Sequence, residues 1–148
     1  MHKFWWLIAF LILVAIVAAL WLLVSNGVAP AQTLTIGEAE LRVEIADTPE
    51  ARRTGLSDRT ELPSDSGMLF VFDEPGLYHF HMQDMQFPID IIWMDEQKRV
   101  VDIAEDVAPE SYPQTFGPSS SAQYVLEVNS GFSAEHGISR GARAELVP

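Results

Sequence analysis

The chain has 148 residues, of which 21 are acidic and 9 are Lys or Arg, and its formal charge is −12. This length accommodates one domain plus a targeting segment. The sequence contains no cysteine, which excludes disulfides, a thiol nucleophile, a lipid-anchored cysteine and a Cys-type zinc site. The acidic charge argues against nucleic acid as a partner, because phosphate binding needs a basic surface.

Residues 4–24 are an uninterrupted apolar run without a charged side chain. As a helix this run would be about 31 Å long, which matches a bilayer core. Lys3 is the only Lys or Arg before it, and no basic residue follows until Arg42. The positive-inside rule therefore predicts a single-pass anchor in the inner (cytoplasmic) membrane, with the N-terminus inside. The alternative is a cleaved signal peptide, because residues 29–31 (Ala-Pro-Ala) resemble a cleavage site. Both interpretations place the domain outside the cytoplasm.

Residues 25–32 form a short polar tether to a domain that spans residues 33–148. Two alternating runs on either side of Gly37 predict a β-hairpin with one buried face. Residues 47–50 (Asp-Thr-Pro-Glu) predict the start of a short helix, because a capping side chain, a proline and an acid follow one another. Gly55 predicts its end.

The central stretch, residues 67–103, contains four short apolar runs at 68–72, 78–82, 89–94 and 99–103. Turn-forming residues separate each run from the next, which predicts strands of an antiparallel meander. Helices would need longer runs with a 3.6-residue repeat. We expect the core to draw mainly on the following positions: Met68, Phe70, Phe72, Ile89, Ile91, Ile92, Val101, Val125, Leu126 and Val128.

Residues 104–121 contain three prolines and no periodicity, and we expect a long loop that is either functional or a cover for one end of the sheet. Residues 123–129 alternate as a strand, residues 131–136 predict one or two helical turns, and residues 143–147 predict a last strand. The predicted fold class is mainly β (α+β with one or two short helices), a compact antiparallel meander or barrel-like domain.

Several segments, in order, resemble the domain of unknown function 192 family: VEIADTPEARRTGLSDR, GMLFVF, FPIDIIWMD, RVVDI and YVLEVNSGFSAEHGISRGAR. The resemblance covers residues 34–147. It implies a small, mainly β domain with one or two short helices, often secreted or membrane-anchored, and it carries over no catalytic activity. The family pattern is matched at Met82, Pro88 and Asp90. This chain departs from it at His81, where the family has Trp.

Two histidines, His79 and His81, form the first candidate site. On one strand their side chains would share a face and could bind one zinc or copper ion. A third donor would then have to come from Asp84, Met85 or His136. Alternatively, one histidine replaces an aromatic residue and the other is solvated. We expect the two rings not to converge on a third ligand.

Three acids, Asp84, Asp90 and Asp95, form the second candidate site, because paired carboxylates can divide acid and base roles. The chain has no nucleophile elbow, phosphate-binding glycine loop, zinc-protease helix or cofactor motif. Asp90 lies between Ile89 and Ile91 in an apolar run. We expect it to be buried, hydrogen-bonded and structural.

The third candidate is the basic cluster Arg52, Arg53 and Arg59, which could bind an anionic ligand or the acidic face of a partner. The alternative is a solvated face with local ion pairs.

These observations favour a membrane-anchored, extracytoplasmic, non-catalytic binding or accessory module, a subunit or partner of an envelope membrane complex. The second hypothesis is a periplasmic metal-binding or small-ligand-binding protein that uses His79 and His81. The third is a hydrolytic enzyme.

Overall fold

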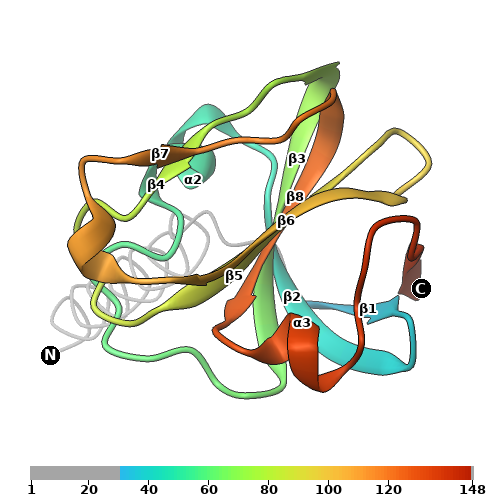
Figure 1. Ribbon diagram of the computed structural model, residues 1–148, viewed down its shortest axis with the longest axis horizontal. Coiled ribbons are helices and arrows are strands. Elements are labelled where there is room, and N and C mark those ends of the chain that lie inside the picture. The colour runs from blue at the N-terminus through green and yellow to red at the C-terminus, as the bar shows by residue number, and fades with distance from the viewer. Residues whose placement is uncertain (1–30, 148) are drawn as a thin grey trace, which may run out of the picture.

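The computed structural model describes residues 31–147 (Figure 1). The expected membrane segment at residues 4–24 and nearly all of the tether lie outside the described residues. In the described part, no helix combines the length and apolar character needed to cross a membrane. The mainly β fold is confirmed, with one curled seven-stranded sheet, a two-stranded sheet and short helices.

The strands and helices follow the chain in the order β1 (Gln32–Ile36), β2 (Ala39–Ala46), α2 (Pro49–Thr54), β3 (Ser66–Gly76), β4 (Phe80–His81), β5 (Ile89–Met94), β6 (Val100–Val107), the 3₁₀ turn η1 (Pro109–Ser111), β7 (Thr115–Phe116), β8 (Ala122–Asn129), α3 (Phe132–Glu135) and β9 (Ala144–Val147).

The first hairpin and the first helix form as the sequence predicts. Strands β1 and β2 pair antiparallel, and Gly37 provides the positive φ of 59° that their tight turn needs. The Thr48 hydroxyl caps α2 by accepting a hydrogen bond from the Ala51 N–H at 3.1 Å. Pro49 occupies the first turn, and Gly55 ends the helix with a φ of 51°.

Of the two predicted arrangements, the curled sheet resembles part of a barrel, whereas the antiparallel meander is wrong. Half of the strand pairs that are consecutive along the chain in the large sheet are not neighbours in it. The order in the large sheet is β6-β5-β8-β3-β2-β1-β9. Strands β2 and β3 pair in parallel, and α2 with the loop after it makes the crossover that a parallel pair requires. Strand β8, from the C-terminal part of the chain, lies between β3 and β5.

Two predicted strand ends are also wrong, one inside the central stretch and one just after it. Strand β3 continues to Gly76, through residues that predict a turn, and its register with β8 shifts between Val71 and Gly76. Pro75 is tolerated there because the ladder is interrupted. Strand β6 extends to Val107, into the start of the predicted long loop, and the short elements η1 and β7 lie within the rest of that loop.

The apolar run at residues 78–82 does not join the large sheet. Only Phe80 and His81 form a strand, β4, which pairs with β7 in a separate two-stranded sheet. The Trp93 indole N–H donates to the Tyr78 carbonyl at 2.8 Å, so that this carbonyl is bonded to a side chain. The Phe80 ring packs edge-on against the Phe70 and Trp93 rings.

Apolar clusters cover both faces of the large sheet. One includes Leu41, Leu126 and Phe132, and the other includes Phe70 and Trp93. All six side chains of β5 are therefore buried. Of the expected core, only two side chains are half-buried, because one lies at a pocket and the other on an edge strand: Phe72 and Val101.

Candidate functional site

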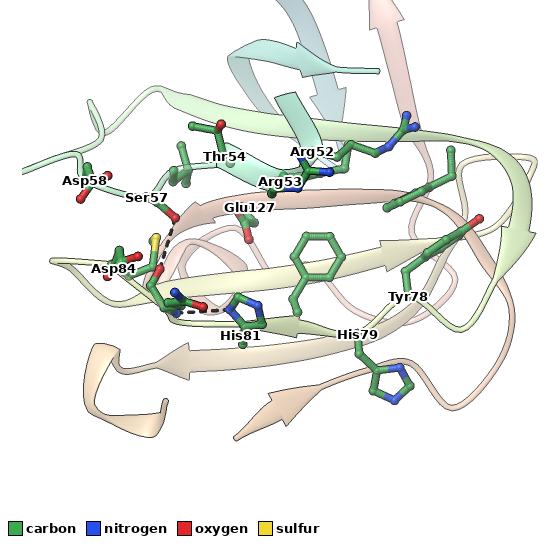
Figure 2. A pocket seen from close by; sticks show the side chains of 17 residues that line it. Arg52, Arg53, Thr54, Ser57, Asp58, Tyr78, His79, His81, Asp84 and Glu127 are labelled. Atoms are coloured by element: carbon green, nitrogen blue, oxygen red, sulfur yellow. Dashed lines mark hydrogen bonds between the residues drawn. The ribbon is translucent and has the colours of Figure 1, made fainter. Parts of the chain in front are cut away.

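A pocket of about 570 Å³ opens on the face of the sheet that carries the Phe70–Trp93 cluster (Figure 2). The end of α2 and the loop after it form one wall. Side chains of β3 form the second wall, and the β3–β4 connection, β4 and the turn after it form the third. This volume is typical of sites that enclose small organic molecules.

Two hydrogen bonds join the first and third walls. The Ser57 hydroxyl donates to the Gln83 carbonyl at 3.2 Å, and the Asp58 N–H donates to the Asp84 carbonyl at 2.9 Å. Both aspartates have positive φ, 62° at Asp58 and 58° at Asp84. A left-handed backbone at a non-glycine residue carries strain, and such residues are enriched at functional sites.

Aromatic side chains make up much of the wall. The Phe72 and Tyr78 rings stack with their centroids 3.5 Å apart. The Arg52 guanidinium lies 5.3 Å from the Phe72 centroid, within the range of a cation–π contact. The Phe70 and Phe80 rings meet edge to face at 4.9 Å. The pocket therefore offers a ligand aromatic rings beside a comparable amount of polar and charged surface.

Glu127 of β8 provides the only acidic group in the buried part of this wall among the described residues. Its residue exposure is 5%, and Figure 2 shows its carboxyl directed into the pocket. Strand register explains the placement, because Glu127 lies opposite Met68 of β3 and opposite Ile91 of β5. Its side chain thus leaves a central strand between two apolar neighbours.

The Glu127 carboxyl has no hydrogen-bond partner among the described residues. Asp90, the other buried aspartate or glutamate, accepts three hydrogen bonds, as buried acids usually do. Burial raises the pKa of Glu127 to about 8, and the positive charge of Arg59 only partly opposes this effect. Near neutral pH this carboxyl is therefore mostly protonated, and a change in the charges around it would readily ionise it.

Arg59 is bound to another acid. Its guanidinium donates two hydrogen bonds, of 2.6 and 2.7 Å, to the two carboxylate oxygens of Glu44. These bonds lower the pKa of Glu44. Glu44 lies opposite Met68, which itself lies opposite Glu127, so the pair occupies the same row of the sheet as Glu127. Arg59 is thus near Glu127 but already neutralised.

The other two arginines of the predicted basic cluster are held differently. Arg52 donates to the carbonyls of Asp47 and Val71, both at 2.7 Å. Arg53 is exposed, and no ion pair or hydrogen bond with a described residue involves its side chain. The predicted cluster is therefore divided into a structural contact, an ion pair and one solvated side chain at the pocket.

Both candidate histidines line the pocket, but each ring has its own local contact. The His79 Nδ1 lies 2.9 Å from the Leu77 carbonyl, and its ring packs so closely on Gly117 that a Cβ there would lie 2.5 Å from it. The His81 Nδ1 accepts from the Gln83 N–H at 3.3 Å. Figure 2 shows the two rings on different sides of the chain. Within residues 31–147, no group of three or more His, Asp or Glu side chains is arranged to hold a metal ion.

The three candidate acids do not come together. Asp84 lies at the pocket, whereas Asp95 accepts from the N–H groups of Gln97 and Arg99 in the turn between β5 and β6. Asp90 is fully buried. It accepts from three backbone N–H groups, those of Asp106 at 2.9 Å, Gly131 at 3.2 Å and Ser133 at 2.8 Å. The prediction that Asp90 is buried and hydrogen-bonded is confirmed.

The sequence interpretation missed Glu127. Its strand alternates in the sequence, so an acid at this position fits a solvated face. The available signal was the pair of apolar neighbours, Leu126 and Val128, together with Val125, which suits a central strand covered on both faces. Only the position of β8 between β3 and β5 shows that this acid is buried.

The model of the domain of unknown function 192 family, described as an uncharacterized ACR, matches residues 32–146. None of the curated proteins matches the chain. A crystal structure of a protein of unknown function from Novosphingobium aromaticivorans DSM 12444 has a TM-score of 0.75 at 28% sequence identity, covering 80% of this chain and 92% of that one.

A second crystal structure is of a Sinorhizobium meliloti 1021 protein provisionally described as a transcription regulator. It has a TM-score of 0.74 at 29% identity and covers 78% of this chain and 93% of that one. Both similarities extend over most of each chain, as does the family match. This chain belongs to the domain of unknown function 192 family.

Proposed function

We propose that this protein is a non-catalytic binding module, anchored in the cytoplasmic membrane by residues 4–24, whose pocket receives a small organic ligand outside the cytoplasm. The observation that carries the proposal is the Glu127 carboxyl, which belongs to a residue that is 5% exposed, has no hydrogen-bond partner among the described residues and faces a pocket lined in part by aromatic rings. A buried polar group without a partner reduces the stability of a fold, and such groups concentrate at functional sites.

The pocket supports binding more than catalysis. A general acid needs a second reacting group nearby. Glu44 is bound on both carboxylate oxygens by Arg59, and the Asp58 and Asp84 side chains are exposed. The two histidines do not form a chain with Glu127, since His79 contacts Leu77 and His81 contacts Gln83.

The test is a fragment screen on the full chain in lipid nanodiscs, followed by amide chemical shifts. The set should contain aromatic compounds that carry cationic, neutral and anionic groups. We expect shifts at Ser57, Phe80 and Glu127, and their loss in Phe80→Ala. A matched control, Phe87→Ala, removes a half-buried ring that does not line the pocket. If no fragment shifts these amides, or if a bound fragment is converted to product, the proposal fails.

The location is a second part of the proposal, and residues 4–24 support it through their length and through Lys3 on one side only. Alkaline phosphatase fused after Gln32 should be active, and green fluorescent protein fused there should be dark. Intact protein should begin at Met1. An N-terminus near Gln32 would instead identify a cleaved signal peptide.

An anchored position also supports an accessory role in an envelope membrane complex. A subunit of such a complex should co-purify with one defined partner in mild detergent. Replacing residues 4–24 with an unrelated membrane helix distinguishes a partner that binds the pocket domain from one that binds the native helix. The partner should be retained if the pocket domain makes the contact and lost if the native helix does.

A further inference from the structure

We propose that the ligand of this pocket is a small organic cation, an ammonium or guanidinium group on an apolar body, whose charge is neutralised by Glu127 in its ionised form. This inference rests on the proposed binding function and adds the chemical class of the ligand. It follows from three features of the pocket, namely the unpartnered acid, the aromatic wall and the balance of charges around them.

The first feature is the missing partner of Glu127. A buried carboxyl that kept only a structural role would be expected to accept backbone N–H groups, as Asp90 does one rung away. Glu127 has no such donor, and its side chain faces the open volume of the pocket (Figure 2). A ligand with N–H donors and a positive charge would supply both the hydrogen bonds and the counter-charge that the protein omits.

The second feature is the aromatic wall. Aromatic faces attract cations, most strongly where water is excluded. The pocket already shows this interaction, because the Arg52 guanidinium lies over the Phe72 ring. Phe70 and Phe80 belong to the apolar cluster on this face of the sheet and line the same pocket as Glu127. An apolar ligand body would pack on these rings while its charged group reached the carboxyl.

The third feature is the charge balance among the groups that face Glu127. The Arg59–Glu44 ion pair is neutral as a unit. The charges of Arg52 and Arg53 on α2 are balanced by Asp58 in the loop after α2 and by Asp84 at the third wall. The remaining titratable groups of the pocket, besides Glu127 and Tyr78, are His79 and His81, also at the third wall.

With both histidines neutral, ionised Glu127 leaves the pocket with a net charge of −1 from two arginines and three acids. Strand β5, on the other side of β8, contributes only the apolar Ile91 beside Glu127. The whole chain carries a formal charge of −12, and its field further favours cations over anions.

Proton release follows from this arrangement. Because burial holds the pKa of Glu127 near 8, most of the free protein carries a proton on this carboxyl at pH 7. A cation binds the ionised form, so the proton leaves to solvent as the ligand enters. Affinity for an ammonium ligand should then fall about tenfold for each pH unit below 7, level off at about pH 9 and fall again above about pH 10, where the ammonium group itself loses its proton.

The test uses three matched probes on the full chain in nanodiscs: phenethylammonium, its neutral analogue phenethyl alcohol and its anionic analogue phenylacetate. We expect phenethylammonium to bind at least about tenfold more tightly than either analogue. Calorimetry at pH 7 in buffers of different ionisation enthalpy should show release of nearly one proton per bound amine.

The variants are Glu127→Gln, which mimics the protonated carboxyl, and Glu105→Gln, which removes an exposed acid outside the pocket. Glu127→Gln should abolish proton release and weaken amine binding at least about tenfold, whereas Glu105→Gln should change neither. Glu127→Gln should also be more stable than the unchanged protein at pH 7, so a loss of binding in this variant cannot come from unfolding.

The alternative outcomes are distinct. If the alcohol or the phenylacetate binds as well as the amine, the cation inference is overturned while the binding function stands. If the amine binds without releasing a proton, or binds equally to Glu127→Gln, the role of Glu127 is overturned. If none of the three probes binds and the wider fragment screen also finds nothing at the pocket, both proposals fail together.

Discussion

Asp90 and Glu127 are two buried acids on neighbouring strands, but only Asp90 has hydrogen-bond donors around its carboxyl. Asp90 of β5 lies opposite Val128, and Glu127 lies opposite Ile91, so the two acids occupy adjacent rungs of the same strand pair. Their side chains leave opposite faces of the sheet. On one face, backbone N–H groups near α3 satisfy Asp90. On the other, the wall formed after α2 leaves an open volume in front of Glu127.

The comparison shows that burial alone does not identify a functional acid. The same β pairing buries both residues, and the difference lies in the loops that cover each face. A buried acid with three donors stabilises the fold, whereas a buried acid with none costs stability and is available to a ligand. The sign of the stability change on neutral replacement therefore distinguishes the two roles.

The largest expected effect is at Asp90. Asp90→Ala leaves three backbone N–H groups without their acceptor and should reduce the free energy of unfolding by about 3–5 kcal/mol. Urea denaturation at pH 7 measures this loss of unfolding free energy. Asp90→Asn keeps one acceptor oxygen and should lose less. A loss below about 1 kcal/mol for Asp90→Ala would remove the contrast between the two acids.

The next effect has the opposite sign. The folded-state pKa of Glu127, about 8, is above the ordinary value of 4.5. Between these values the unfolded chain ionises while the folded chain keeps its proton, so Glu127 lowers stability as pH rises. Glu127→Gln should therefore stabilise the domain by about 3 kcal/mol at pH 7.5 and by almost nothing at pH 4. Equal stability of the two proteins at pH 7.5 would contradict the raised pKa.

Asp102 sharpens the comparison, because it is a carboxylate with many partners near the surface of β6. Burial alone would raise the pKa of Asp102, but hydrogen bonds from Ser119, Arg140 and Ile103 more than offset it and lower the pKa to about 2. Here the folded-state pKa is depressed, so the stabilisation is present above pH 4 and is lost as pH falls toward 2.

Asp102→Asn should accordingly cost about 2 kcal/mol at pH 7 and little at pH 2. Unfolding curves at the two pH values measure the difference. Asp65 provides a control, since its ion pair with Arg42 is exposed on both sides. Asp65→Asn should change stability by less than about 1 kcal/mol, with little dependence on pH.

The smallest effect on stability concerns Arg59. This guanidinium lowers the pKa of both Glu44 and Glu127. Arg59→Gln should raise both pKa values, while stability changes by about 1 kcal/mol or less because the ion pair is partly solvated. Carboxyl carbon shifts followed from pH 3 to 10 report the two titrations. An unchanged Glu127 titration would show that Arg59 has no electrostatic influence on the pocket.

The features that local sequence determines are the ones the structure confirms. Thr48, Pro49 and Gly55 define the short helix through capping and backbone preference, and Gly37 defines the first turn. The burial of Asp90 was predictable because four apolar or rigid neighbours flank it, namely Pro88, Ile89, Ile91 and Ile92. Each of these inferences depends on residues within a few positions of one another.

The pairing of strands was not predictable in the same way. Strand β8 enters the sheet between β3 and β5, and β2 joins β3 in parallel, so the order depends on contacts between distant parts of the chain. Residues 78–82 have the composition of a central strand, yet Trp93 bonds the Tyr78 carbonyl and Phe80 packs against two rings. Tertiary packing here overrides β propensity.

The sequence by itself determined a mainly β domain, its family, its hairpin, the ends of α2 and the burial of Asp90, because these follow from local chemistry and from matched segments. Only the tertiary structure decided which acid faces the pocket. The alternation of side chains along a strand places Glu127 on one face of the sheet, but it does not determine what covers that face. The covering elements come from residues 52–58 and 78–85, far from Glu127 in the chain, and their placement makes a buried acid available to a ligand.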